Sequence, residues 1–106
     1  MTDATQALHD LVLEAMANGY ESFECVLEQV LPWASQRGIK AARSDVAKGL
    51  EWAIREGYAK AYLLSAQPPH SQPVAFSRER LDDLWYYVTP NGMQRVEQLE
   101  REPNGQ

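Results

Sequence analysis

Apolar positions in the first half of the chain recur every three or four residues, the pattern of helices that bury one face. Three stretches show it: Ala7 to Ala17, a second helix capped by Ser22 and running through Ala34, and a third capped by Ser44 and ending at Gly57. Asn18-Gly19 and Arg37-Gly38 predict the breaks between them. Pro32 lies inside the second stretch, where it removes a backbone hydrogen bond, so we expect that helix to kink or end nearby.

The second half changes to segments rich in aromatic and aliphatic residues, which favour strands. Tyr58 to Leu64 and Leu84 to Val88 are both predicted to be strands. The proline-containing segment Ser65 to Asp83 between them is too long for a tight hairpin turn and is expected to be largely irregular. Within it, Ser77 is expected to cap a single helical turn from Arg78 to Asp82.

A last helix is predicted from Thr89-Pro90 through Leu99, because a capping residue followed by proline is a typical helix start. Residues 1–6 and 102–106 are expected to be flexible. With 106 residues, 44% of them hydrophobic, the chain suffices for one buried core. The sequence therefore predicts a single α+β domain, mainly helical, over residues 1–106.

Two stretches carry a resemblance to a known family. SDVAKGLEWAIREGY (Ser44 to Tyr58) looks like the third helix of a winged helix-turn-helix domain running into its wing, and YYVTPNGM (Tyr86 to Met93) looks like the strand-to-helix junction on the far side of the wing. Together with the order of elements, the chain resembles the winged helix-turn-helix superfamily of MarR-like and PadR-like regulators. The resemblance implies three helices, a two-stranded wing hairpin, a C-terminal helix and binding to double-stranded DNA.

Charge is distributed unevenly along this acidic chain, whose formal net charge is −5. Residues 1–36 contain six acidic residues and no lysine or arginine, whereas residues 37–60 contain six basic residues and three acidic ones. A DNA-binding surface is normally basic, because it meets a polyanion. The overall charge therefore opposes DNA binding, and the middle of the chain is where a DNA-binding surface is expected.

The third helix, drawn as a wheel at about 100° per residue, turns Val46, Leu50 and Ile54 toward the core. The same wheel turns Lys48, Arg55 and Trp52 outward. The candidate DNA-binding residues are Arg37, Lys40, Arg43, Ser44, Lys48, Trp52, Arg55, Arg78 and Arg80.

Each candidate has an expected role. Lys48 and Arg55 would reach phosphates or guanine edges, and Ser44 would bind the backbone at the helix N-terminus. The three cations before the helix would clamp the sugar-phosphate backbone, Gly49 would allow close approach of a backbone, and the two arginines of the wing connection would enter a minor groove together with His70. The alternatives stay open: the cations are ordinary solvated charges, and Trp52 covers the wing loop or a partner.

No arrangement of reactive side chains predicts an enzyme, a cofactor or a metal site. Cys25 is the only cysteine, which excludes an internal disulfide, and it is expected to be a small apolar residue of the second helix. Only His9 and His70 are available as bases or as histidine ligands. The acidic pair Asp82-Asp83 is expected to point in two directions rather than converge on a substrate.

The expected location is the cytoplasm. The chain has one cysteine, no stretch of about 18 apolar residues that would span a membrane, and no basic residue before Arg37, where a secretory signal needs one.

Three functions compete on this basis. The first is a DNA-binding transcriptional regulator, expected to be a homodimer because two-fold operators need two copies, with the first or last helix pairing the subunits. The second is an acidic protein-interaction module that uses Trp52 and the tyrosine-rich strands, namely Tyr58, Tyr62, Tyr86 and Tyr87. The third is a small-molecule sensor with a pocket under the wing lined by Trp33, Trp85 or Tyr87.

Overall fold

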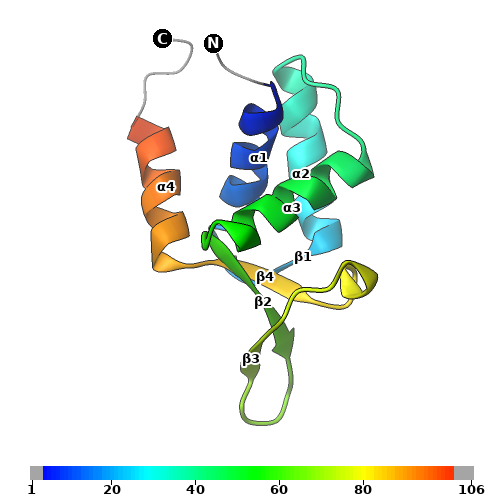
Figure 1. Ribbon diagram of the computed structural model, residues 1–106, viewed down its shortest axis with the longest axis vertical. Helices are drawn as coiled ribbons and strands as arrows, with labels where there is room; N and C mark the ends of the chain where they lie inside the picture. Colours follow the sequence, from blue (N-terminus) through cyan, green and yellow to red (C-terminus); the bar gives the residue numbers. More distant parts are fainter. Residues whose placement is uncertain (1–3, 102–106) are drawn as a thin grey trace.

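The chain folds into a helical layer resting on a small antiparallel sheet, from which a hairpin projects (Figure 1). The computed structural model describes residues 4–101. The elements are α1 (Ala4–Ala15), β1 (Glu21–Ser22), α2 (Phe23–Gln36), α3 (Arg43–Arg55), β2 (Ala59–Leu64), β3 (Ser71–Val74), the 3-10 turn η1 (Arg78–Arg80), β4 (Trp85–Val88) and α4 (Pro90–Arg101). The predicted α+β class with a mainly helical content is confirmed.

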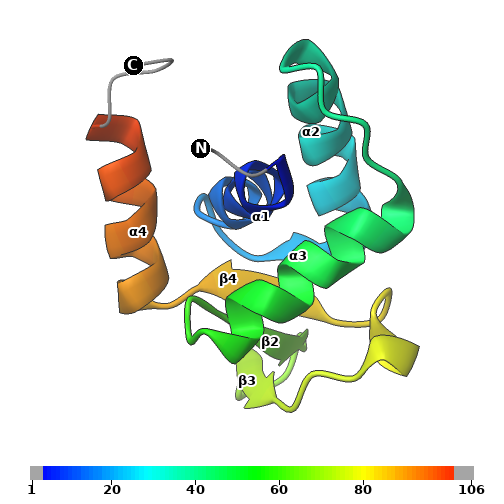
Figure 2. The same cartoon turned by 45° about the horizontal axis from the view of Figure 1, so that its top comes forward.

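The first helix lies at the centre of the helical layer, with α2, α3 and α4 around it (Figure 2). Its apolar residues Leu11, Val12 and Leu13 are buried. Gly49 of α3 is also buried, and a β-carbon built there would lie 2.9 Å from Val12 Cγ2. The close approach that Gly49 permits is therefore that of α1, and the expectation that it would admit an external backbone is wrong.

Helix starts agree with the sequence at α2 and differ at α3. Ser22 caps α2 as predicted, with its hydroxyl accepting the Cys25 N–H at 3.2 Å. The α3 helix instead begins at Arg43, with Ala42 as the residue before it, and the Ala42 N–H donates to the Asp45 carboxylate at 2.9 Å. Ser44 thus lies inside the first turn and is not the cap.

The ends of α2 and α3 share one geometry. Gly38 and Gly57 follow these helices with φ of 72° and 79°, the left-handed conformation that glycine adopts without strain. In each case the next N–H returns to the helix, from Ile39 to the Ala34 carbonyl and from Tyr58 to the Ala53 carbonyl, both at 2.8 Å. The α2 helix runs through Pro32 and ends four residues later at Gln36, so the helix does not end at the proline itself.

The sheet has four strands in the order β1-β4-β2-β3, which corrects the predicted two-stranded wing. The two predicted strands exist and pair with each other, with Lys60 opposite Tyr87. The short β1 pairs with β4, and β3 pairs with β2 to form a hairpin closed by a hydrogen bond from the Ser65 N–H to the His70 carbonyl at 2.9 Å. The segment between the predicted strands is therefore more regular than expected.

That segment also contains the single turn predicted after Ser77. It is the 3-10 turn η1, although the Ser77 side chain makes no capping hydrogen bond. At the chain ends, α1 begins at Ala4 rather than at the predicted Ala7, and residues 1–3 and 102–106, which were expected to be flexible, lie outside the described part of the chain.

The junction before α4 explains the Thr-Pro-Asn-Gly stretch. Thr89 caps the helix as predicted, accepting the Gly92 N–H at 3.1 Å, and its hydroxyl donates to the Gly57 carbonyl at 2.6 Å. A β-carbon at Gly92 would overlap the carbonyl oxygen of Tyr58. The start of α4 is therefore fastened to the start of β2. None of the helices described here has the length and apolar character needed to cross a bilayer.

Candidate nucleic-acid interface

An exposed stripe runs along α3 on the side away from the core. Ser44, Lys48 and Arg55 are exposed, and Glu51 falls between them at helical spacing. The wheel from the sequence turned Lys48 and Arg55 outward, and their exposure agrees with it. The stripe presents two cations, one hydroxyl and one carboxylate along about three turns of helix.

The carboxylate of this stripe is paired. Arg78 of η1 reaches across to α3 and places its guanidinium 2.9 Å from the Glu51 carboxylate. The pair is near the surface, with about half of the Arg78 side chain exposed, so its contribution to stability is small, about 0–1 kcal/mol. The pair matters more for the charge of the stripe, because Arg78 cancels the negative charge of Glu51, which lies between Lys48 and Arg55.

A second arginine, at the start of α3, is held in a similar way. One guanidinium nitrogen of Arg43 contacts both oxygens of Asp82, at 2.6 and 2.7 Å, and the group lies 4.8 Å from the centre of the Phe23 ring. The side chain of Arg43 is still 52% exposed. The segment around η1 thus lies beside α3. It supplies Asp82 to pair with Arg43 and Arg78 to pair with Glu51.

The remaining candidate cations lie in different places. Lys40 and Lys48 line one shallow cleft of about 240 Å³ between α1 and the start of α3. Arg37 instead lines a cleft between α2 and α4 together with Glu14 and Trp33. Burial raises the pKa of the Glu14 carboxyl, and the charge of Arg37 opposes that rise. The structure therefore separates Arg37 from the other cations of the candidate site.

Trp52 does not lie on the outward stripe. Its ring is 5.2 Å from that of His9 on α1 and 5.4 Å from that of Tyr58, measured between centroids. The wheel turned Trp52 outward, but α1 extends far enough to cover that side of α3. What Trp52 covers is α1 of its own chain, so its assignment to the DNA-facing surface is corrected.

The hairpin of β2 and β3, which we call the wing, offers little positive charge. Arg78 and Arg80, which were predicted to lie in the wing connection and to enter a minor groove, belong to η1 beside α3. The tip of the wing, residues 65–70, is exposed and contains His70 but no lysine or arginine. Of the three residues predicted to enter a minor groove, His70 is therefore the one that lies on the wing.

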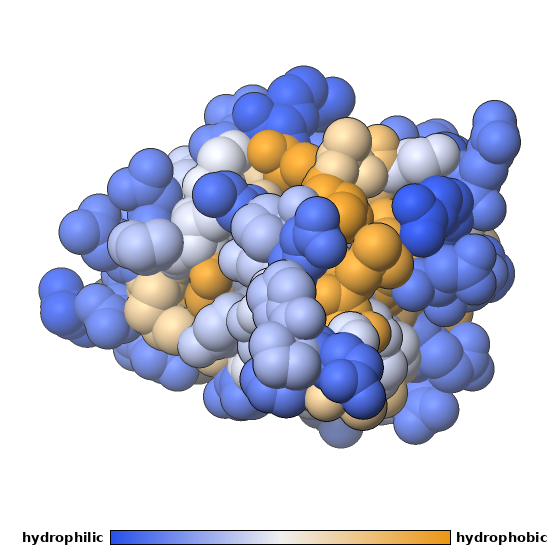
Figure 3. Space-filling model, turned by 90° about the horizontal axis from the view of Figure 1, so that it is seen from below, coloured by the Kyte–Doolittle hydropathy of each residue, from blue (hydrophilic) through white to orange (hydrophobic). Residues whose placement is uncertain are grey.

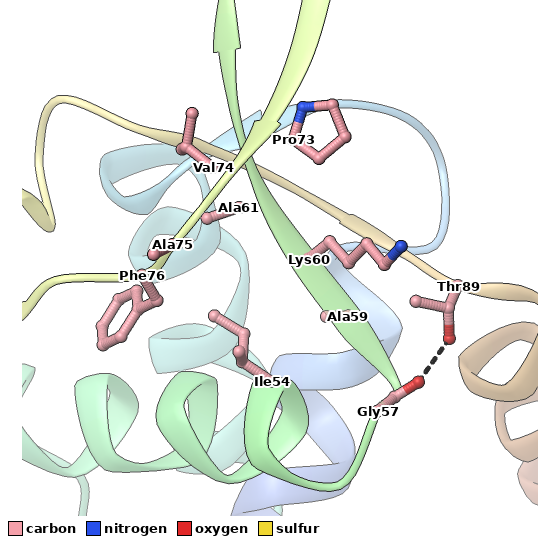
Figure 4. A pocket seen from close by; sticks show the side chains of 10 residues that line it. All are labelled: Ile54, Gly57, Ala59, Lys60, Ala61, Pro73, Val74, Ala75, Phe76 and Thr89. Atoms are coloured by element: carbon pink, nitrogen blue, oxygen red, sulfur yellow. Dashed lines mark hydrogen bonds between the residues drawn. The ribbon is translucent and has the colours of Figure 1, made fainter.

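An apolar groove lies between α3 and the wing. From below, apolar residues form a band along one side of the wing (Figure 3). The groove has a volume of about 380 Å³, and its wall includes Ile54, Ala61, Val74 and Phe76. Ile54 rises from α3 toward the strands and Phe76 lies beside it (Figure 4). The predicted sensor pocket lined by Trp33, Trp85 or Tyr87 is not this groove, since none of the three is part of its wall.

Two features of this region were not predicted from the sequence, namely the groove and the arginine–carboxylate pairs. The groove carries a faint sequence signal, the alternation Val74-Ala-Phe76 after Pro73. The pair Arg43–Asp82 joins residues 39 positions apart and has no local signal. Cys25 is half-buried on α2, and within residues 4–101 no three histidine, cysteine or acidic side chains gather in a way that would hold a metal.

Comparison with models of known protein families, with curated proteins and with solved structures found no match to this chain.

Proposed function

We propose that this chain is a winged helix-turn-helix DNA-binding domain of a transcriptional regulator, with α3 as the helix that enters the major groove. The order of three helices, a projecting hairpin and a further helix supports the fold assignment. The connection between α2 and α3, residues 37–42, is longer than the three or four residues of a tight helix-turn-helix turn. The proposal therefore rests on the surface of α3 rather than on the turn.

The observation that carries the proposal is the exposed stripe of α3. In helix-turn-helix proteins the N-terminal residues of the second helix meet base edges. Ser44 and Lys48 occupy that half of α3, and Arg55 lies farther along the same side, where it would meet phosphate. Glu51, which would repel a phosphate, is neutralised by Arg78.

Further charge for the backbone comes from Lys40, which shares a cleft with Lys48. Arg43 is half exposed, but its charge is paired with that of Asp82, so it is not counted. On a mixed-sequence duplex, where no base edge is read, Lys40, Lys48 and Arg55 make about three phosphate contacts per copy. Three contacts correspond to a slope of log affinity on log salt near −2.7, or about a fortyfold loss between about 50 and 200 mM salt, and a dimer that binds with both copies doubles the slope. Under this proposal the protein acts in the cytoplasm, has no enzymatic activity, and binds DNA as a homodimer.

The test is a titration of fluorescently labelled mixed-sequence duplex with the purified protein at low and at moderate salt. We expect binding that weakens steeply with salt, and a further loss of about tenfold or more for Lys48→Glu and for Arg55→Glu. Arg101→Glu is the matched control, because it makes the same charge change on an exposed residue of α4. Absence of binding at low salt, or equal losses for all three variants, would overturn the proposal.

A second function is favoured by the apolar groove between α3 and the wing. In a DNA complex this groove would lie next to the duplex, where an apolar lining has no phosphate to bind. An apolar side chain of a protein partner fits it better, and the net charge of −5 is compatible with such a partner. Under this alternative Phe76→Ser abolishes partner binding and the charge reversals on α3 do not affect it.

A further inference from the structure

The face of the sheet that points away from the helices is unusually rich in aromatic residues. Lys60, Tyr62 and Leu64 alternate along β2 with the inward-facing Ala59 and Ala61. Strand pairing places Tyr87 opposite Lys60, Trp85 opposite Tyr62 and Ser71 opposite Leu64 on the same side. We call this side the outer face, and Tyr20 from the segment before β1 joins it through its ring contacts.

The aromatic rings of the outer face are held in place by one another. The ring of Tyr20 lies 5.1 Å from that of Tyr62, almost perpendicular to it, and 5.3 Å from that of Tyr87. The Tyr20 hydroxyl donates to the Ser71 hydroxyl on β3 at 3.1 Å. Because the rings of Tyr20, Tyr62 and Tyr87 pack against each other, they form a continuous surface.

This surface holds three of the four large apolar or aromatic side chains that are notably exposed among the described residues. The four are Tyr20 by 39%, Leu64 by 38%, Trp85 by 36% and Leu31 by 36%. All but Leu31 belong to the outer face. Among the strand positions of that face, Lys60 is the only charged residue. Aromatic residues without acidic neighbours are typical of the centre of a protein interface.

We propose that the outer face is where two copies of this chain pair, with the two wings packed side by side in opposite directions around a two-fold axis. In this arrangement the exposed tip of each wing, which contains Pro68 and Pro69, lies on the aromatic rings at the base of the other wing. One face thus supplies both halves of the contact, as a two-fold interface requires. The pairing is independent of whether the protein binds DNA.

Charge and the state of the other surfaces favour a second copy as the occupant. Two chains of net charge −5 repel each other, and they approach with least repulsion through a face without acids. The apolar residues of α1 are already buried in their own core, and the exposed positions of α4 are polar, so neither helix offers a comparable surface. A stable dimer buries about 800 Å² per copy, and the six exposed residues of the tip, 65–70, enlarge the surface that the partly exposed rings and Leu64 present.

The experiment is sedimentation velocity of the full chain over a wide range of concentration, with circular dichroism to confirm that each variant is folded. We expect a concentration-dependent dimer in the wild type. Trp85→Ser and Leu64→Asp should each weaken it at least tenfold, whereas Leu31→Ser, which changes an equally exposed apolar residue on α2, should leave it intact. The double change Pro68→Ser and Pro69→Ser tests the tip and should also weaken the dimer.

Three outcomes would overturn this inference. One is a wild type that is monomeric at every concentration, and another is a dimer that only Leu31→Ser disrupts. The third is a monomer whose outer face binds a proline-rich peptide, because the occupant is then another protein. Salt-dependent DNA binding by a monomer would overturn the pairing and the homodimer while leaving the assignment of DNA binding to α3 standing, so the two proposals fail separately.

Discussion

Gly92 is the residue at which the fold tolerates a side chain least. A β-carbon there would overlap the backbone carbonyl of Tyr58 and lie 3.1 Å from the β-carbon of Val88. Backbone cannot rotate out of the way, so we place the overpacking cost of Gly92→Ala at about 3 kcal/mol, the upper end of the usual range. The better helix propensity of alanine returns about 1 kcal/mol, which leaves a net loss of about 2 kcal/mol.

Urea denaturation measures this loss directly. The neighbouring Asn91→Ala is the control, because Asn91 is exposed in the same turn of α4 and its replacement should change the stability by less than about 0.5 kcal/mol. A Gly92→Ala protein as stable as the wild type would mean that α4 does not meet β2 as described.

Tyr86 ties the sheet to the segment around η1 and makes stability depend on pH. It is fully buried, and its hydroxyl donates to the Leu81 carbonyl at 2.8 Å. Burial, helped by the charges of Asp82 and Asp83, raises the pKa of Tyr86 well above its usual value. The unfolded chain therefore loses this proton first, and the stability that Tyr86 contributes is complete below about pH 10 and declines above it.

Tyr86→Phe removes both the hydrogen bond and the titrating group. At neutral pH we expect it to lower the free energy of unfolding by about 1–2 kcal/mol, since the Leu81 carbonyl loses its partner. Above pH 10 the wild type should lose stability faster than the variant, so that the difference between them narrows. Denaturation curves at both pH values test this, with Tyr58→Phe as a control outside the Leu81 contact. A difference that widens with pH would contradict the assignment.

At the residue scale, the sequence predicted what depends on near neighbours. The caps at Ser22 and Thr89 and the outward direction of Lys48 and Arg55 follow from positions a few residues apart. The prediction for Trp52 was wrong because a helical wheel gives the direction of a side chain but not which element lies in that direction. The pairing of Arg43 with Asp82 depends on the tertiary fold, which no local pattern contains.

At the scale of elements, η1 adjusts the charge of α3. If Arg78 acts by neutralising Glu51, Arg78→Ala weakens DNA binding several-fold and Glu51→Gln strengthens it, because a bare carboxylate repels phosphate. Arg78→Ala should then have a much smaller effect when Glu51→Gln is already present.

A double-mutant cycle tests this prediction: the affinity for duplex DNA is measured for the wild type, the two single variants and the double variant. This prediction depends on the proposed function. An equal effect of Arg78→Ala in both backgrounds would mean that Arg78 contacts DNA directly. The stability of all three proteins should stay within about 1 kcal/mol of the wild type, since exposed ion pairs contribute little.

Element boundaries show where sequence patterns stop being informative. Both long strands were predicted because they are rich in residues of high β-propensity. β3 was missed because Ser71, Gln72 and Pro73 have low strand propensity, and the strand exists only because β2 offers it a pairing edge. The short β1 is two residues long and has no pattern of its own.

At the scale of the whole molecule, the surfaces divide by charge. Acidic residues dominate the first two helices, cations gather around α3, and the outer face of the sheet is nearly uncharged. The sequence predicted the acidic and basic regions, because they are contiguous along the chain. It did not predict the outer face, which brings Tyr20, Tyr62, Trp85 and Tyr87 together from three segments.

The proline of β3 also limits how far association can spread. Pro73 lies on the last strand of the sheet and has no N–H to offer, and at the opposite edge β1 is only two residues long. A further strand would therefore find few hydrogen-bonding groups at either edge, which is how natural sheets avoid endless edge-to-edge stacking. Association through the sheet would therefore use its outer face, where a two-fold dimer leaves no second outer face free for a third copy. The chain is thus protected from growing into fibres.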